Sequence, residues 1–257
     1  MLDLNITLLQ TTLHWENPSA NRIHINALLD NIEATDLIVL PEMFNTGFSM
    51  DSKKLAEEMD GSTIQWMLEQ AKKRKAVITG SLIVKEGESY FNRLIWMRPN
   101  GTSEWYDKKH LFRMANEDTH FASGKSKLIV ELKGWKICPL ICYDLRFPVW
   151  SRNVEKFDLL LYVANWPEAR ISAWEKLIYA RAIENQCYVA AVNRIGTDGK
   201  DIQYSGNSVF IDPKGELIWK AKDHKEEIKT LEISWDNLTA FRKKFPVALD
   251  ADSFKLT

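Results

Sequence analysis

Three short segments of the sequence consist almost entirely of apolar residues: Leu37–Leu40, Lys136–Ile141 and Asp158–Ala164. Successive side chains of a β-strand point to opposite faces of the sheet, so a strand that is apolar throughout needs cover on both sides. Further strands are predicted over Leu4–Leu9, Ala76–Val84, Leu128–Leu132 and Tyr188–Val192. A chain with several strands of this kind is predicted to fold as a layered α/β protein.

Three segments between predicted strands have apolar residues at helical spacing and are predicted to be helices: Asn21–Ala34, Ser62–Lys75 and Ala173–Gln186. Two turn sequences, 98–101 and 212–215, each separate a pair of short strands and predict hairpins. The paired strands are Tyr90–Met97 with Thr102–Tyr106, and Asn207–Ile211 with Glu216–Lys220. No linker rich in Gly, Ser or Pro and no internal repeat interrupts the chain. We therefore expect a single domain over residues 1–257, with a C-terminal arm from about residue 237.

Charge and composition argue against several classes of protein. The 34 basic and 35 acidic residues leave a formal charge of -1 and form no long block of one sign, which disfavours nucleic-acid binding and a basic membrane patch. No apolar run approaches the ~20 residues that a membrane span requires. Three cysteines are not a disulfide framework, and the N-terminal residues show no secretory signal pattern, so we expect a cytoplasmic protein.

Cys142 is the first candidate for chemistry, because it follows a predicted buried strand and precedes Pro148, which suits the first turn of a helix. A cysteine in that place can expose its sulfur at the carboxyl edge of the sheet, where α/β ligand sites gather. The alternative is a small buried hydrophobic residue. A zinc site shared with Cys138 is rejected, because four strand residues separate the two by ~13 Å, whereas zinc–sulfur bonds are ~2.3 Å long.

Two charged positions accompany the cysteine. Glu42 stands at the end of an apolar strand, where a carboxylate costs desolvation free energy unless it has a partner. Lys108 and Lys109 leave another strand, and adjacent strand residues point to opposite faces, so one can face a site while the other faces water. The alternatives are a strand-end glutamate paired with a surface lysine, and two surface lysines.

A cysteine, a carboxylate and an ammonium group together suffice to cleave an amide. The ammonium group favours the thiolate and, with a backbone N–H, stabilises the oxyanion of the tetrahedral intermediate. The carboxylate accepts the thiol proton and later delivers it to the departing ammonia. A Cys–His arrangement through His110, His120 or His224 remains open, although no local motif supports it.

Six segments, in the same order and over almost the whole chain, resemble the nitrilase superfamily of carbon–nitrogen hydrolases. They are Leu37–Glu42 (LIVLPE), Tyr106–Phe112 (YDKKHLF), Ile141–Pro148 (ICYDLRFP), Val163–Pro167 (VANWP), Ala180–Gln186 (ARAIENQ) and Tyr204–Ser208 (YSGNS). Each segment is weak evidence alone, but the ordered combination is specific. The resemblance implies a four-layer αββα sandwich, a homodimer whose sheets continue across the interface, and neither a metal nor an organic cofactor.

The resemblance also implies a Glu-Lys-Cys triad, on Glu42, Lys108 and Cys142. Lys108 is chosen over its neighbour because the lysine of the family stands two residues after the aromatic residue. We expect the backbone N–H of Tyr143, at the turn, to hold the oxyanion together with Lys108.

A second glutamate that supports the site fits best at Glu117, with Asp118 as the competing position. The stretches Glu42–Met50 (EMFNTGFSM) and His110–Glu117 (HLFRMANE) look most like the bacterial omega-amidase branch. That likeness implies hydrolysis of the terminal amide of a small α-keto acid, such as 2-oxoglutaramate, through a cysteine thioester.

Such a dicarboxylate-like substrate requires a cation at its far end. Arg113, Arg146 and Arg170 are the candidates, although Arg146 is expected to pair with a nearby carboxylate instead. Phe48 and Trp166 are expected to form walls of the pocket, with packing in the core as the alternative for the tryptophan.

Three rival functions remain. A nitrilase and a carbamoyl-amide hydrolase would use the same triad, so the spacing of the triad residues in the sequence does not distinguish them from an amidase. An interaction protein without activity is disfavoured, because all three triad residues are present.

Overall fold

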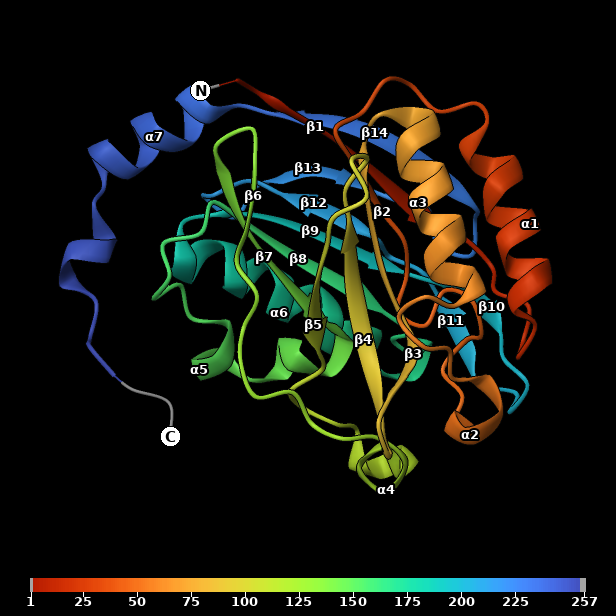
Figure 1. Cartoon of the computed structure of the whole chain (residues 1–257). Coiled ribbons are helices and arrows are strands. Elements are labelled where there is room, and N and C mark those ends of the chain that lie inside the picture. The colour runs from red at the N-terminus through yellow and green to blue at the C-terminus, as the bar shows by residue number, and fades with distance from the viewer. Residues whose placement is uncertain (1, 255–257) are drawn as a thin grey trace.

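Two six-stranded mixed sheets form the centre of the structure, a computed structural model that describes residues 2–254 (Figure 1). The first sheet has the strand order β14-β1-β2-β3-β4-β5 and the second has the order β13-β12-β9-β8-β7-β6, while β10 and β11 form a separate two-stranded ribbon. The first sheet contains β1 (Leu4–Gln10), β2 (Leu37–Val39), β3 (Val77–Glu86), β4 (Ser89–Met97), β5 (Ser103–Asp107) and β14 (Glu227–Ile233). The second contains β6 (Val130–Leu132), β7 (Trp135–Ile141), β8 (Leu159–Ala164), β9 (Tyr188–Asn193), β12 (Val209–Ile211) and β13 (Leu217–Lys220). The ribbon consists of β10 (Ile195–Thr197) and β11 (Gln203–Ser205).

Helices cover the outer face of each sheet. α1 and α3 contact each other over the first sheet, and α6 contacts β9 and β12 of the second (Figure 1). The helices are α1 (Pro18–Leu29), α2 (Ser52–Leu55), α3 (Ser62–Arg74), α4 (Glu117–His120), α5 (Pro148–Ser151), α6 (Ile171–Asn185) and α7 (Trp235–Lys244). Short 3-10 turns are η1 (Arg113–Ala115), η2 (Cys142–Arg146), η3 (Glu168–Arg170) and η4 (Val247–Asp250).

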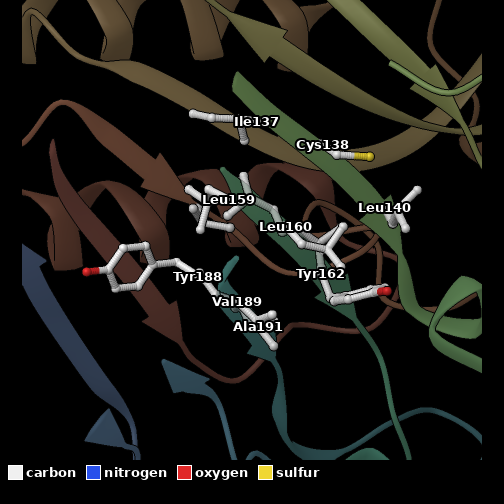
Figure 2. Packing of buried hydrophobic residues seen from close by; sticks show 14 of the residues in the cluster. Ile137, Cys138, Leu140, Leu159, Leu160, Tyr162, Tyr188, Val189 and Ala191 are labelled. Carbon is white, nitrogen blue, oxygen red and sulfur yellow. The ribbon is translucent and has the colours of Figure 1, made fainter. Parts of the chain in front are cut away.

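The largest hydrophobic core lies around β7, β8 and β9, which are parallel neighbours and almost completely buried. Ile137, Leu160 and Val189 show this packing (Figure 2). Contacts of β1 with β9 and of β4 with β7 join the two sheets, and a second core fills the space between the first sheet and α1 with α3. The predicted four-layer αββα sandwich is confirmed, and the apolar strands occupy its interior because both of their faces need cover.

The first helix differs from its predicted range, 21–34. It begins at Pro18, because the side chain of Asn17 accepts a hydrogen bond from the backbone N–H of Ala20 at 3.1 Å and proline fits the first helical turn. It ends at Leu29, so Ile32 packs against the core from outside the helix.

The C-terminal part of the chain continues from β14 into α7, which packs beside the second sheet. Leu238 of this helix is buried, and Arg242 Nη1 lies 2.6 Å from Asp158 Oδ1. After α7 most side chains are exposed. Residues 1 and 255–257 of the predicted domain lie outside the described residues. Among the helices of residues 2–254, none is both long enough and apolar enough to span a membrane.

Candidate active site

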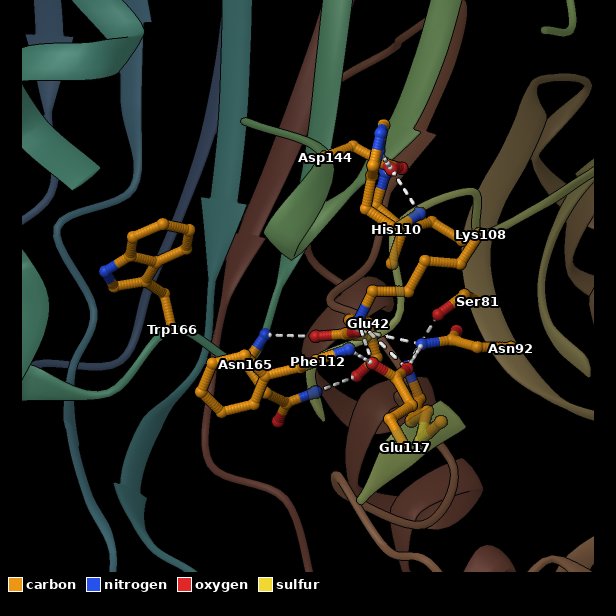
Figure 3. Close-up of polar contacts among 12 residues, drawn as sticks. Glu42, Ser81, Asn92, Lys108, His110, Phe112, Glu117, Asp144, Asn165 and Trp166 are labelled. Carbon is orange, nitrogen blue, oxygen red and sulfur yellow. Dashed lines mark hydrogen bonds and ion pairs between the residues drawn. The ribbon is translucent and has the colours of Figure 1, made fainter. Parts of the chain in front are cut away.

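The carboxyl ends of strands from both sheets bring three side chains together, two of which, Glu42 and Lys108, are labelled in Figure 3. Glu42 lies beyond β2, Lys108 directly follows β5, and Cys142 directly follows β7. Parallel strands of α/β sheets carry their ligand sites at these ends, which explains why residues so far apart in the sequence meet. Cys142 has a backbone φ of 43°, in the left-handed region that non-glycine residues seldom adopt. This strained conformation sits at the first residue of η2 and turns the chain sharply after the strand.

Lys108 lies between two carboxylates. Its Nζ donates to Glu42 Oε1 at 2.8 Å and to the two carboxylate oxygens of Glu117 at 3.0 and 2.9 Å. The three side chains have no solvent exposure. Asn92 Nδ2 donates to both glutamates, at 2.8 Å to Glu42 and 3.2 Å to Glu117. A buried ammonium group thus has two acidic partners.

Asn165 fixes the other side of Glu42. Its backbone N–H donates to Glu42 Oε2 at 2.8 Å, and its side-chain amide donates to the main-chain carbonyl of Glu42 (Figure 3). Glu42 is therefore held at both carboxylate oxygens and at its backbone. The charge of this carboxylate acts on the nearby Cys142 thiol and raises its pKa.

Burial and charge set the protonation states of the site. Burial acts to lower the pKa of Lys108, but the charges of Glu117 and Glu42 outweigh it and raise the pKa above its usual value, so Lys108 stays an ammonium ion. Burial, followed by the charge of Glu42, raises the pKa of the Cys142 thiol well above its ordinary value. Burial and the charge of Glu42 also raise the pKa of Glu117, although Lys108 opposes this. Cys142 therefore rests as a neutral thiol beside a carboxylate, and a base must remove its proton.

Asp144 joins the lysine segment to the cysteine segment. Its buried carboxylate accepts hydrogen bonds from the Tyr106 hydroxyl at 2.7 Å, from the backbone N–H of Ile141 at 3.1 Å, and from the backbone N–H of His110 at 3.0 Å. Nδ1 of His110 lies 2.8 Å from the same carboxylate. The network holds the start of η2 against the chain that follows β5, and so fixes Cys142 relative to Lys108.

The alternative Cys–His arrangement is not what the structure shows. His110 is turned towards Asp144 and stacks on Phe147 with ring centroids 3.7 Å apart. Neither His120 nor His224 lines the cavity that contains Cys142.

A cavity of about 810 Å³ opens over the cysteine. Phe48, Tyr143, Trp166 and Arg170 line it, as does Lys108. The guanidinium of Arg170 lies 5.0 Å from the ring centroid of Phe112. The backbone N–H of Tyr143, the second residue of η2, is one of the first N–H groups of this turn, which have no acceptor within the turn itself.

Two arginine predictions are corrected. Arg113 does not line the cavity; its side chain is 85% exposed and pairs with Asp118 at 2.9 Å, because η1 turns it towards solvent. This pairing also leaves Glu117, not Asp118, in contact with Lys108. Arg146 was expected to pair with a local carboxylate, but its guanidinium lies 5.0 Å from the ring centroid of Trp166 and lines the cavity.

Sequence reasoning missed Asn92 and Asn165. Asn165 had a detectable signal, because it lies in the segment that follows the apolar strand β8, at the same sheet edge as Cys142. Asn92 stands in the middle of β4, and only its burial beside two glutamates in the folded chain reveals its role. No group of three or more His, Cys, Asp or Glu side chains within residues 2–254 is arranged to hold a metal ion.

Comparison with known proteins decides the family. Residues 5–243 match the family described as carbon-nitrogen hydrolase. The chain belongs to this family. The carbon-nitrogen hydrolase is 46% identical over 256 residues to the omega-amidase YafV of Escherichia coli (strain K12), and the match covers 100% of both chains. It is 33% identical to the 2-oxoglutaramate amidase of Bacillus subtilis, with 94% of this chain and 95% of that protein covered.

A solved structure agrees with both sequence matches. XC1258 from Xanthomonas campestris, described as a CN-hydrolase superfamily protein with an arsenic adduct in the active site, superimposes with a TM-score of 0.98. Its sequence is 47% identical, and 100% of each chain is covered. The resemblance to the nitrilase superfamily and to its omega-amidase branch is confirmed.

Proposed function

We propose that this carbon-nitrogen hydrolase is an omega-amidase, which hydrolyses the terminal amide of a small α-keto acid such as 2-oxoglutaramate to a carboxylate and ammonia. The observation that carries the proposal is the contact of one ammonium group, Lys108, with the carboxylate of Glu42 beside the Cys142 thiol. The names of the two amidases that the chain resembles supply the substrate class.

The first half of the reaction forms a thioester. Glu42 takes the proton from the neutral thiol of Cys142, and the sulfur attacks the amide carbon. Negative charge moves to the amide oxygen, where Lys108 and the backbone N–H of Tyr143 stabilise it. Glu42 then delivers its proton to the nitrogen, the carbon–nitrogen bond breaks, and ammonia leaves.

The second half returns the enzyme to its starting state. Glu42 removes a proton from a water molecule, which attacks the thioester carbon, and the same oxyanion donors stabilise the second tetrahedral intermediate. The carbon–sulfur bond breaks, the carboxylic acid leaves, and the proton held by Glu42 returns to Cys142. Glu117 contributes by holding the ammonium group of Lys108 through both halves.

The cavity also provides for the far end of the substrate. Arg146 and Arg170 line it, and each guanidinium stacks over an aromatic ring, which leaves its N–H groups able to bind a carboxylate. Phe48 and Trp166 supply apolar walls for the carbon chain. A linear amide with a carboxylate at its other end fits this cavity, because its amide would meet Cys142 and its carboxylate would meet the two arginines.

Ammonia release from a panel of compounds tests the substrate class. We expect the highest kcat/KM with 2-oxoglutaramate, a lower value with succinamate, and the lowest values with glutamine and simple nitriles. A preference for nitriles would indicate a nitrilase, and release of carbon dioxide with ammonia would indicate a carbamoyl-amide hydrolase. Either result would contradict the omega-amidase proposal.

Two further properties belong to this proposal. A homodimer is supported by the family resemblance and by the exposed apolar side chains Phe245, Leu249 and Phe254 after α7. Light scattering on the eluting protein tests it, since a monomer mass would contradict it. A cytoplasmic location is supported by three free, buried cysteines, which suit a reducing compartment. Cell fractionation with an antibody tests this location.

A further inference from the structure

Arg194 is a buried cation that the reaction does not use. Its side chain is fully buried at the end of β9, yet it forms no ion pair with an acidic side chain of residues 2–254. Its hydrogen bonds go to the main-chain carbonyls of Ile195, Leu13 and Thr197, at 3.1, 3.3 and 3.4 Å. Nη1 has no hydrogen-bond partner. Burial lowers the pKa of Arg194, but a guanidinium remains charged in proteins, so a true cation is held here.

The guanidinium touches several segments that are distant in the sequence. Ile195 and Thr197 form the ends of β10, and Leu13 follows β1. The guanidinium carbon lies 4.7 Å from the ring centroid of Tyr204 in β11. A Cβ placed on Gly47 would lie 3.4 Å from Nη1, so Arg194 also packs directly on the backbone of the loop that follows Glu42.

These segments are walls of the active-site cavity. Phe48, next to Gly47, lines the cavity, and its ring centroid lies 5.0 Å from Nζ of Lys108. Tyr204 and Asp198 also line it, and the Tyr204 hydroxyl donates to Asp198 at 3.0 Å. β11 also contacts η3, the turn that ends in Arg170.

The β10–β11 ribbon lies outside the main sheets. It belongs to neither six-stranded sheet, and its two strands pair over three residues each (Figure 1). One further bridge, between Thr12 and Ile195, connects it to the end of β1. A two-stranded ribbon alone is only marginally stable, so its position depends on what anchors it.

We propose that Arg194 is a positioning residue for substrate binding, which holds the Gly47–Phe48 loop and the β10–β11 ribbon together and so sets which amides the cavity accepts. It does not touch the reacting atoms, and bond breaking is left to Glu42, Lys108 and Cys142. This inference rests on the proposed amidase function.

Lysine cannot replace arginine in this role. The planar guanidinium stacks on Tyr204 while Nε and Nη2 reach carbonyls in different directions, whereas a lysine carries a single point charge on a flexible stem. Arg194→Lys therefore keeps the charge and loses the geometry. Small misplacement of groups that hold a substrate has large effects on rate at low substrate concentration, and we expect KM to rise roughly tenfold or more.

The test compares Arg194→Lys and Arg194→Gln with a matched control, Arg74→Lys. Arg74 has a 9% exposed side chain and also donates to a main-chain carbonyl, that of Leu29, but it lies on α3 away from the cavity. kcat and KM are measured for 2-oxoglutaramate, succinamate and propionamide, and folding is followed by circular dichroism. Wild-type protein is measured first. If it releases no ammonia from 2-oxoglutaramate, the proposed function fails, and Arg194 is then tested with the amide that the wild type does hydrolyse.

We expect the Arg194 variants to raise KM for the carboxylated amides roughly tenfold, to change kcat by less than about threefold, and to reduce the preference for these amides over propionamide. Arg74→Lys should leave KM, kcat and the preference for carboxylated amides over propionamide unchanged. Three results would overturn the proposal: wild-type kinetics in the Arg194 variants, a loss of kcat with every amide at constant KM, or failure of both variants to fold. The last result would make Arg194 a stability residue only.

Discussion

Replacement of Lys108 by methionine separates the role of its charge from that of its volume. Methionine is similar in length and apolar, so it fits the same buried channel without the ammonium group. The substitution removes the three hydrogen bonds to Glu42 and Glu117 and leaves two buried carboxylates facing each other. Asn92 still donates to both, but it supplies no charge.

The cost in stability follows from this geometry. Removal of one partner from a buried ion pair destabilises a protein by about 3–5 kcal/mol, and the complete burial of Lys108 places the variant at the upper end of that range. The loss depends on pH. The pKa of Glu117 is already raised above its unfolded value by burial and by Glu42, and it rises further without Lys108. A carboxyl group with a raised pKa binds its proton more tightly in the folded state, so the variant recovers stability as the pH falls.

Urea unfolding at about pH 8 and about pH 6 measures both effects, and ammonia release measures activity. Lys109→Met is the matched control, because Lys109 is the adjacent lysine and its Nζ lies 5.6 Å from the ring centroid of Trp150 rather than beside a glutamate. We expect Lys108→Met to lose several kcal/mol more than the control at the higher pH, with a smaller difference at the lower pH. Its kcat should fall by at least about 10²–10³, the usual effect of removing one oxyanion donor. Equal stability of the two variants, or a difference that does not change with pH, would refute the reasoning.

Four other variants extend the test. Cys142→Ala should abolish ammonia release while leaving the circular dichroism spectrum unchanged; residual wild-type turnover would rule out the thioester route. Arg146→Met and Arg170→Met should each raise KM for 2-oxoglutaramate by about 10–100-fold, since a hydrogen bond to a charged group contributes about 1.5–3 kcal/mol. Neither variant should change KM for propionamide, which has no carboxylate. An equal rise in KM with both amides would argue against carboxylate binding. Asp144→Ala should lower the free energy of unfolding in urea by about 3 kcal/mol or more, because it leaves several buried donors without an acceptor; a loss below about 1 kcal/mol would show that the network is weak.

The layers of the fold were predictable because burial leaves a clear pattern in the sequence. β7 and β8 are apolar along nearly their whole length, and strands of that kind fit only between two covering layers. The range of α1 was predicted less well. Its start depends on a side-chain cap from Asn17, and its end at Leu29 is not marked by any break in the apolar spacing, which continues to Ile32.

The chemistry of the site was predictable where it depends on reactive residue types at strand ends. Glu42, Lys108 and Cys142 stand in motifs that follow strands, and the fold brings these ends together. The supporting contacts were not predictable, because they depend on side-chain direction. Asn92 is a polar residue in the interior of a strand, and Arg146 stacks on a tryptophan that is 20 residues away in the sequence.

Intact-protein mass spectrometry after rapid acid quenching tests the central claim most directly. Wild-type enzyme is mixed with excess 2-oxoglutaramate and quenched during turnover, and the adduct is located by peptide digestion. The proposed mechanism predicts a mass increase equal to the substrate minus ammonia, on the peptide that contains Cys142, and no such increase in Cys142→Ala. Turnover without any adduct in the wild type, or an equal adduct in the alanine variant, would contradict the claim that Glu42, Lys108 and Cys142 act as one catalytic centre.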